Sequence, residues 1–233
     1  MIILVLLSGC SEQLGQSVQT VTQAVTQSNV DSSTSTSDQV SFLDSESIFT
    51  QADSMLSSAK QSVLLEMYEL GNPSELKLLE ADADKGIPVL LLLDPKEPQS
   101  QMSVVELKAH NVSVIMAKGP LIGGNGIQHA KMLIVDDTQV LIGGMNWGKG
   151  SYKNADADVF LTGQLAKNAQ AVFVKDWEAV GGHIPQSVVN ERTTGSSILS
   201  GQPLLKEILL TLDNSSLIQA SLFEISNYHY SVT

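Results

Sequence analysis

Residues 128–136 read Gln-His-Ala-Lys-Met-Leu-Ile-Val-Asp, an apolar run with a histidine and a lysine near its start and an aspartate at its end. Side chains alternate between the two faces of a β-strand, so a strand here places His129 and Lys131 on one face and Asp136 on the other. Attack on a phosphate needs a nucleophile beside a fixed ammonium, because the cation offsets the anionic charge that repels the attacking group. The run therefore predicts a strand that carries a phosphate-directed pair of side chains.

A turn and a glycine-rich segment come next. Residues 136–138 are typical of a turn, and the apolar residues 140–142 then lead into Gly143-Gly144-Met145-Asn146. Glycine lets a backbone approach a ligand closely, and the amide of Asn146 can donate hydrogen bonds to an oxyanion without adding a charge. We therefore expect Gly143, Gly144 and Asn146 to contact the substrate phosphate.

A third strand is predicted over residues 154–161, which read Asn-Ala-Asp-Ala-Asp-Val-Phe-Leu. Asp156 and Asp158 lie on the same face of this strand. Either carboxylate can accept the second ring N–H of His129, which orients the imidazole and leaves its other nitrogen free to react.

Three motifs thus follow one another in order: His129-x-Lys131-x4-Asp136, Gly143-Gly144-x-Asn146 and Asn154-x-Asp156. Together they resemble the HKD signature of the phospholipase D superfamily. The resemblance implies a phosphodiesterase. It also implies an α/β fold, the α-β-α sandwich of that superfamily, with a mixed sheet flanked by helices.

The same resemblance implies a role for each matched residue. His129 would become a phosphohistidine, and Asp156 would orient its ring. Lys131 and Asn146 would hold the phosphoryl oxygens, so the reaction would need no metal or other cofactor. The superfamily usually has serine where Gly144 stands, so this chain lacks a hydroxyl at that point.

Four other side chains near these motifs allow two interpretations. Asp136 belongs to the matched catalytic motif, but it faces away from the histidine and sits at a turn, so a structural ionic role stays open. Glu66 and Tyr68 share a strand face and either can line the site entrance, although core packing is favoured for Tyr68. Trp147 fits contact with an acyl chain or a base as well as it fits ordinary packing.

Composition limits the class of protein. The 233 residues are 42% hydrophobic, enough for one full domain and a remainder. The formal net charge of -12 argues against indiscriminate binding to nucleic-acid phosphates, which relies on lysine and arginine. Nucleic acid is therefore a possible but less favoured partner than lipid.

Residues 1–10 end in the only cysteine of the chain. The apolar residues 1–9 are too few to span a bilayer, and the segment Leu7-Ser8-Gly9-Cys10 resembles a bacterial lipoprotein signal, in which cleavage leaves a lipid-modified cysteine. We expect Cys10 to anchor the protein in the bacterial cell envelope, outside the cytoplasm. The alternative is a short apolar terminus with a buried thiol. Residues 11–41, rich in Ser, Thr and Gln, are predicted to be a disordered tether.

The next region, residues 42–182, alternates helical and strand patterns, which indicates βαβ units and a sheet covered on both faces. Helices are predicted around residues 48–59, 74–85, 102–109 and 164–180, and strands at 61–70, 87–93, 112–116 and in the three motif segments. Residues 183–202 are predicted to be a linker. Residues 203–233 are predicted to open a second repeat, because Phe223-Glu224-Ile225 mirrors Tyr68-Glu69-Leu70.

Cleavage through a phosphohistidine needs a second group that protonates the departing alkoxide. The resemblance implies the histidine of a second HKD motif, supplied either by a further half of the protein or by a second copy of the chain. The remaining histidines, His110, His183 and His229, are not expected to act as this second acid.

The sequence thus predicts a phospholipase D-type phosphodiesterase acting on phospholipid, by hydrolysis or by transfer to an alcohol. The alternatives are a nuclease that uses the same residues and a non-catalytic anion-binding module of the cell envelope.

Overall fold

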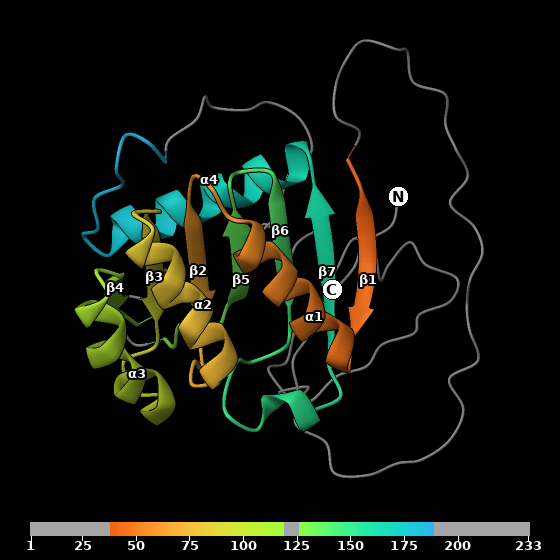
Figure 1. The fold of residues 1–233 in the computed structure, drawn as a ribbon, viewed down its shortest axis with the longest axis horizontal. Helices are drawn as coiled ribbons and strands as arrows, with labels where there is room; N and C mark the ends of the chain where they lie inside the picture. The colour runs from red at the N-terminus through yellow and green to blue at the C-terminus, as the bar shows by residue number, and fades with distance from the viewer. Residues whose placement is uncertain (1–37, 119–125, 189–233) are drawn as a thin grey trace, which may run out of the picture.

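The computed structural model describes residues 38–118 and 126–188 (Figure 1). Within them the elements are, in order, β1 (Val40–Asp44), α1 (Ser45–Ser58), β2 (Val63–Met67), α2 (Pro73–Asp84), β3 (Val89–Leu93), α3 (Pro98–Ala109), β4 (Ser113–Met116), β5 (Lys131–Val135), β6 (Gln139–Gly143), the 3-10 helix η1 (Ser151–Lys153), β7 (Ala157–Thr162) and α4 (Gln164–Ala179). The predictions about Cys10, nearly all of the tether and residues 203–233 lie outside the described residues.

The seven strands of the described residues form one mixed sheet in the order β1-β7-β6-β5-β2-β3-β4. β2, β3 and β4 are parallel and are joined through α2 and α3, while β5, β6, β7 and β1 pair antiparallel. Because β5 runs antiparallel to β2, the start of β5 lies beside the end of β2. We call the side of the sheet where these strand ends meet its site edge, or simply this edge of the sheet. That edge also receives the end of β6 and the start of β7.

Helices cover both faces of the sheet, as the sequence pattern predicted. α1, α2 and α3 lie on one face and α4 crosses the other (Figure 1). Two of these helices bury an apolar stripe: α1 places Ile48, Ala52, Met55 and Leu56 against the sheet, and α4 buries Phe173 and Trp177. The expected α-β-α sandwich with a mixed sheet is confirmed.

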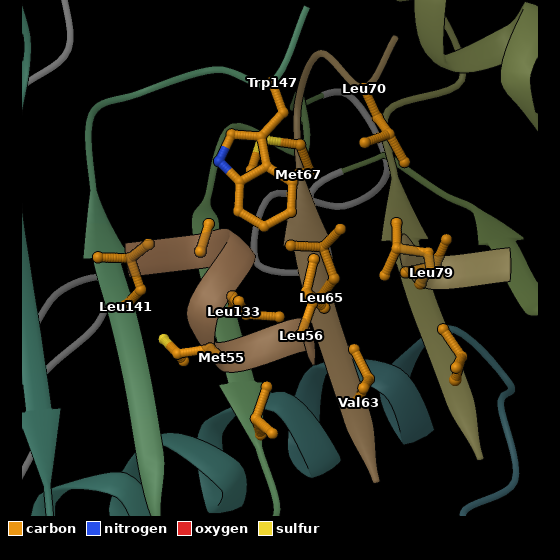
Figure 2. Close-up of a cluster of buried hydrophobic side chains, with 14 of the residues drawn as sticks. Met55, Leu56, Val63, Leu65, Met67, Leu70, Leu79, Leu133, Leu141 and Trp147 are labelled. Carbon is orange, nitrogen blue, oxygen red and sulfur yellow. The ribbon is translucent and has the colours of Figure 1, made fainter. Parts of the chain in front are cut away.

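The larger core lies between the sheet and helices α1 to α3. Figure 2 shows Met55 and Leu56 of α1 against Leu65 of β2 and Leu133 of β5, with Trp147 beside the end of β2. Trp147 is almost fully buried, so this side chain packs in the core, one of its two expected uses. Its burial fastens the segment after β6 to the sheet.

Several element boundaries differ from the sequence prediction. β1 begins at Val40, inside the predicted tether, and α3 begins at Pro98 rather than near residue 102. β5 is shorter than residues 128–136, and His129 precedes the strand. At the start of the predicted linker, Ile184 and Val188 are buried in the core under α4.

Candidate active site

His129 and Lys131 lie at the edge of the sheet where β5 begins. Lys131 is the first residue of β5 and only 4% exposed, because its neighbours in the strand are apolar and buried on both faces. Its Nζ donates a hydrogen bond to the backbone oxygen of His129 over 2.8 Å. The imidazole of His129 stays partly exposed to solvent. The structure thus brings the predicted pair together, with the cation buried and the imidazole accessible.

Tyr68 packs against both members of this pair. Its ring centroid lies 4.8 Å from that of His129 at an interplanar angle of 55°, and the Nζ of Lys131 lies 5.3 Å from the Tyr68 ring centroid. Sequence reasoning favoured plain core packing for Tyr68 and left it out of the site. The pairing of β2 with β5 brings Tyr68 to the site, because Met67 pairs with Lys131 and Tyr68 is the next residue along the chain.

The surroundings lower the pKa values of both groups. The pKa of His129 falls to about 4, mainly because the packed ring loses solvent and also because the charge of Lys131 opposes a second cation. Burial lowers the pKa of Lys131 to about 8, although Asp156, Asp158 and Glu69 partly offset this effect. At neutral pH the imidazole is therefore uncharged and able to act as a nucleophile, while the lysine remains mostly a cation.

The segment from Gly143 to Asn146 forms a turn around a buried carboxylate. Asp158 Oδ1 accepts hydrogen bonds from the backbone N–H groups of Gly144 and Met145 at 2.8 and 3.1 Å. A Cβ at Gly143 would overlap the Asp158 carboxylate, so only glycine permits this close approach. The Oδ1 of Asn146 is buried and has no hydrogen-bond partner among the described residues.

This turn is also fastened to the end of β2. The N–H of Trp147 donates to the backbone oxygen of Glu69 over 2.8 Å, and the N–H of Gly71 donates to the backbone oxygen of Trp147 over 2.7 Å. These bonds hold the asparagine that precedes Trp147 at the edge of the sheet that carries Lys131.

The two candidate orienting carboxylates differ in their surroundings. Asp158 is buried, and its carboxylate is held by hydrogen bonds from the turn. Desolvation raises the pKa of Asp158 to about 6, although the two N–H donors act in the opposite direction. Asp156 is half-buried, and among the described residues its carboxylate accepts from the N–H of Ala157, at 2.9 Å; desolvation raises its pKa as well. Neither carboxylate is hydrogen-bonded to His129 in the described residues, and both act electrostatically on Lys131.

Asp136 lies away from this site. It follows the last residue of β5, so about seven residues of extended chain, on the order of 20 Å, separate it from His129. Its carboxylate accepts backbone N–H groups from three consecutive residues, Lys60, Gln61 and Ser62, at 2.7 to 3.1 Å. The sequence predicted Asp136 to be one of the catalytic residues, with a structural role as the alternative. In the structure Asp136 takes the structural role, because it binds the loop between α1 and β2.

Glu66 does not line an entrance, because it is only 2% exposed and faces the core under α4. Of the other histidines, the His110 ring contacts Asp84 at 2.9 Å on the surface, and His183 follows α4, where its backbone oxygen accepts from the Trp177 ring. His229 lies outside the described residues.

Within residues 38–118 and 126–188, no cluster of three or more histidine, cysteine, aspartate or glutamate side chains is arranged to hold a metal ion. In the same residues, no helix combines the length and apolar character that crossing a bilayer demands.

Comparison with known proteins places the chain in a family. A family model described as the cardiolipin synthase, PLD-like domain matches residues 53–177, more than half of the chain. Nuc from Salmonella typhimurium, described as a phospholipase D family member, superposes with a TM-score of 0.54 at 23% identity, over 61% of this chain and 96% of Nuc. NucT from Helicobacter pylori superposes with a TM-score of 0.55 at 24% identity, over 61% of this chain and 98% of NucT.

No curated protein matches the chain significantly. The solved structures share its fold, and the family match covers the β2-to-α4 region that builds the site. The chain therefore belongs to the PLD-like domain family of the cardiolipin synthase type, within the phospholipase D superfamily.

Proposed function

We propose that this protein cleaves phosphodiesters by taking the phosphoryl group onto His129. The observation that carries the proposal is the pairing of an accessible, neutral imidazole with a buried ammonium at one sheet edge. Among the described residues no carboxylate lies within ion-pairing distance of the Lys131 Nζ, whose one hydrogen bond goes to a neutral carbonyl. A buried cation without an anionic partner is unfavourable, and a bound phosphate would supply that partner.

In the proposed reaction a ring nitrogen of His129 attacks phosphorus, a nitrogen–phosphorus bond forms and the bond to one ester oxygen breaks. Lys131 offsets the negative charge on the phosphoryl oxygens, and the Asn146 side-chain amide donates hydrogen bonds to them. The departing alkoxide takes a proton from a second acid, which we assign to a second HKD histidine, from a further half or from a second copy of the chain. Water then releases phosphate from His129 as a monoester, or an alcohol accepts it as a new diester.

We assign Asp156 as the orienting carboxylate. Support comes from its half-exposed position and single local hydrogen bond, which leave the carboxylate able to turn toward the imidazole, whereas the two N–H donors of the turn hold Asp158. Gly143 and Gly144 would bring the turn backbone close to the phosphate.

Phospholipid is the substrate class that we propose first. The family description names cardiolipin synthase, the net charge of -12 disfavours nucleic-acid backbones, and an acylated Cys10 would hold the site beside lipid. Lipid attachment is tested by incorporation of labelled palmitate in bacterial cells, which Cys10→Ala should abolish.

One observation favours the nuclease alternative. Tyr152 on η1 is 55% exposed, and the Nζ of Lys153 lies 5.4 Å from its ring centroid. An exposed aromatic ring with a cation is the kind of surface on which an unpaired base stacks, and η1 lies in the connection between Asn146 and Asp156.

The discriminating experiment measures headgroup release from phosphatidylglycerol and phosphatidylethanolamine vesicles in parallel with cleavage of single-stranded and plasmid DNA. The full-length protein is compared with His129→Gln. Headgroup release that requires His129 supports the proposed substrate. DNA cleavage that requires His129 supports the nuclease instead. If neither substrate is turned over and the protein binds phosphate tightly, the result supports the non-catalytic anion-binding module.

A further inference from the structure

Gln128, which directly precedes the proposed nucleophile, donates its side-chain amide to a buried carboxyl group. Its Nε2 lies 2.6 Å from Oε2 of Glu66 on β2. The two side chains are 4% and 2% exposed, respectively. Glu66 lies on the sheet face covered by α4, where its same-face neighbour Leu64 packs among apolar residues. This polar contact lies in a layer whose core is mostly apolar.

A second bond holds the backbone of the same residue. The N–H of Gln128 donates to Oδ2 of Asp94 over 2.8 Å, and Asp94 is fully buried just after β3. The other oxygen of Asp94 accepts the N–H of Lys96 over 2.8 Å, which fixes the carboxylate itself. Gln128 is therefore tied to β3 through its backbone and to β2 through its side chain, one residue before His129.

Burying the carboxyl group of Glu66 at this position destabilises the fold. Burial, with the nearby charge of Asp176 on α4, raises the pKa of Glu66 to about 8, while the Gln128 amide acts in the opposite direction. Its second oxygen, Oε1, is buried and has no partner among the described residues. Leucine or methionine would fill the space without this desolvation cost. The feature that an apolar residue could not supply is an acceptor oxygen for Gln128.

We propose that Glu66 is a positioning residue for His129: its buried carboxyl oxygen holds the Gln128 side chain and thereby fixes the segment that presents the imidazole to the phosphate. Glu66 lies in β2, and Tyr68 follows Met67, the last residue of that strand. The same stretch of chain therefore supports the backbone before His129 through Glu66 and contacts the imidazole ring through Tyr68. The inference rests on the proposed function of His129.

The primary test does not need turnover. Side-chain NMR titration of the histidines, with His129 assigned through His129→Gln, reports the surroundings of the ring directly. Glu66→Met removes the acceptor at similar size, and Glu66→Gln keeps an acceptor oxygen in a side chain that cannot ionise. The matched control is Glu75→Gln. Glu75 is as deeply buried as Glu66 but lies on α2, where the nearby charge of Asp53 helps to raise its pKa, and within the described residues its side chain makes no hydrogen bond to the His129 segment.

In the wild type we expect His129 to titrate near pH 4. In Glu66→Met its pKa should move toward the ordinary value near 6.5, because a loosened segment lets water reach the ring. Glu66→Gln should restore the low pKa, and Glu75→Gln should leave it unchanged. A well-folded Glu66→Met protein with a wild-type His129 titration would overturn the proposal, as would a Glu66→Gln variant that behaves like Glu66→Met.

If Glu66→Met does not fold, the double variant Glu66→Met/Gln128→Met replaces the polar pair with two apolar side chains of similar size and keeps the test decisive. It should show the same raised His129 pKa, and a wild-type value would refute the role.

Turnover separates the inference from the function beneath it. With bis(4-nitrophenyl) phosphate as substrate, Glu66→Met should lower kcat about tenfold to a hundredfold with little change in KM, since small misplacement of a reacting group costs up to about that much. A wild-type protein whose turnover does not require His129 refutes the proposed function. A Glu66→Met variant with wild-type kcat, in a protein that does require His129, refutes only the positioning role.

Discussion

Replacing Lys131 with methionine should stabilise the fold while removing activity. Lys131 is almost fully buried, and its pKa of about 8 lies well below its ordinary value of 10.5. At 1.36 kcal/mol per pKa unit, holding the charged form in the folded state at pH 7 costs about 3 kcal/mol. Methionine has a similar length and no charge, and it forfeits one hydrogen bond to the His129 backbone oxygen, worth about 1 kcal/mol. The free energy of unfolding should therefore rise by about 2 kcal/mol.

The gain should depend on pH with a definite sign. Between about pH 8 and 10.5 the folded protein releases the Lys131 proton while the unfolded chain retains it, so wild-type stability rises with pH in this window relative to the variant. Urea unfolding followed by circular dichroism at pH 7 and at pH 10 measures the difference. The advantage of Lys131→Met should be largest at pH 7 and should shrink at pH 10.

Lys167→Met is the matched control, because Lys167 is exposed on α4 and should change stability by less than about 0.5 kcal/mol. The reasoning is refuted if Lys131→Met lowers the free energy of unfolding at pH 7, or if its effect is the same at both pH values. It would also fail if the stabilised variant retained phosphodiesterase activity, since the cation would then have no role in the reaction.

Three further perturbations test other parts of the structure. Asp136→Ala should cost about 3 kcal/mol in urea unfolding, because three backbone N–H groups lose their acceptor and alanine tolerates the φ of 56° poorly, whereas Asp136→Asn should cost about 1 kcal/mol. Gly143→Ala should lower the melting temperature through overlap with the Asp158 carboxylate, while Gly150→Ala, whose new methyl group meets open space, should be neutral; equal melting temperatures would contradict the packing argument. With bis(4-nitrophenyl) phosphate, whose leaving group departs without needing a proton, the initial rate of phosphoryl transfer to His129 in rapid quench should stay flat from pH 7 to about 5 and fall near pH 4, because only the neutral imidazole attacks; a fall centred at pH 6.5 would show an ordinary histidine.

The fold could be predicted because its helices and strands carry clear local patterns. The apolar stripe of α1, the buried runs of β2 and β3 and the amphipathic α4 are all visible in the sequence, and the structure confirms them. β1 was missed because it is a short edge strand with mostly exposed residues, adjoining a tether-like segment. Only its pairing with β7 makes it a strand, and that pairing joins residues more than a hundred positions apart.

The site was predictable where a motif gathers its residues within a few positions, as for His129 and Lys131. Tyr68 and Glu66 were named as residues that could line the entrance, but their actual contacts with the His129 segment were not predicted, because these depend on the pairing of β2 with β5, which no local pattern reveals. Asp136 was grouped with the catalytic residues because a motif records proximity in sequence. In the structure Asp136 lies at the opposite end of β5 from Lys131, where it binds the loop that leads from α1 into β2.

The most direct test of the central claim is the capture of phosphate on His129. Full-length protein is mixed with bis(4-nitrophenyl) phosphate or labelled phospholipid, quenched in alkali within milliseconds to seconds, and analysed by intact mass and peptide mapping. We expect an acid-labile, alkali-stable adduct of a phosphoryl monoester on His129, absent from His129→Gln. Catalysed cleavage in a His129→Gln protein, or an adduct on any other residue of the wild type, would contradict this claim.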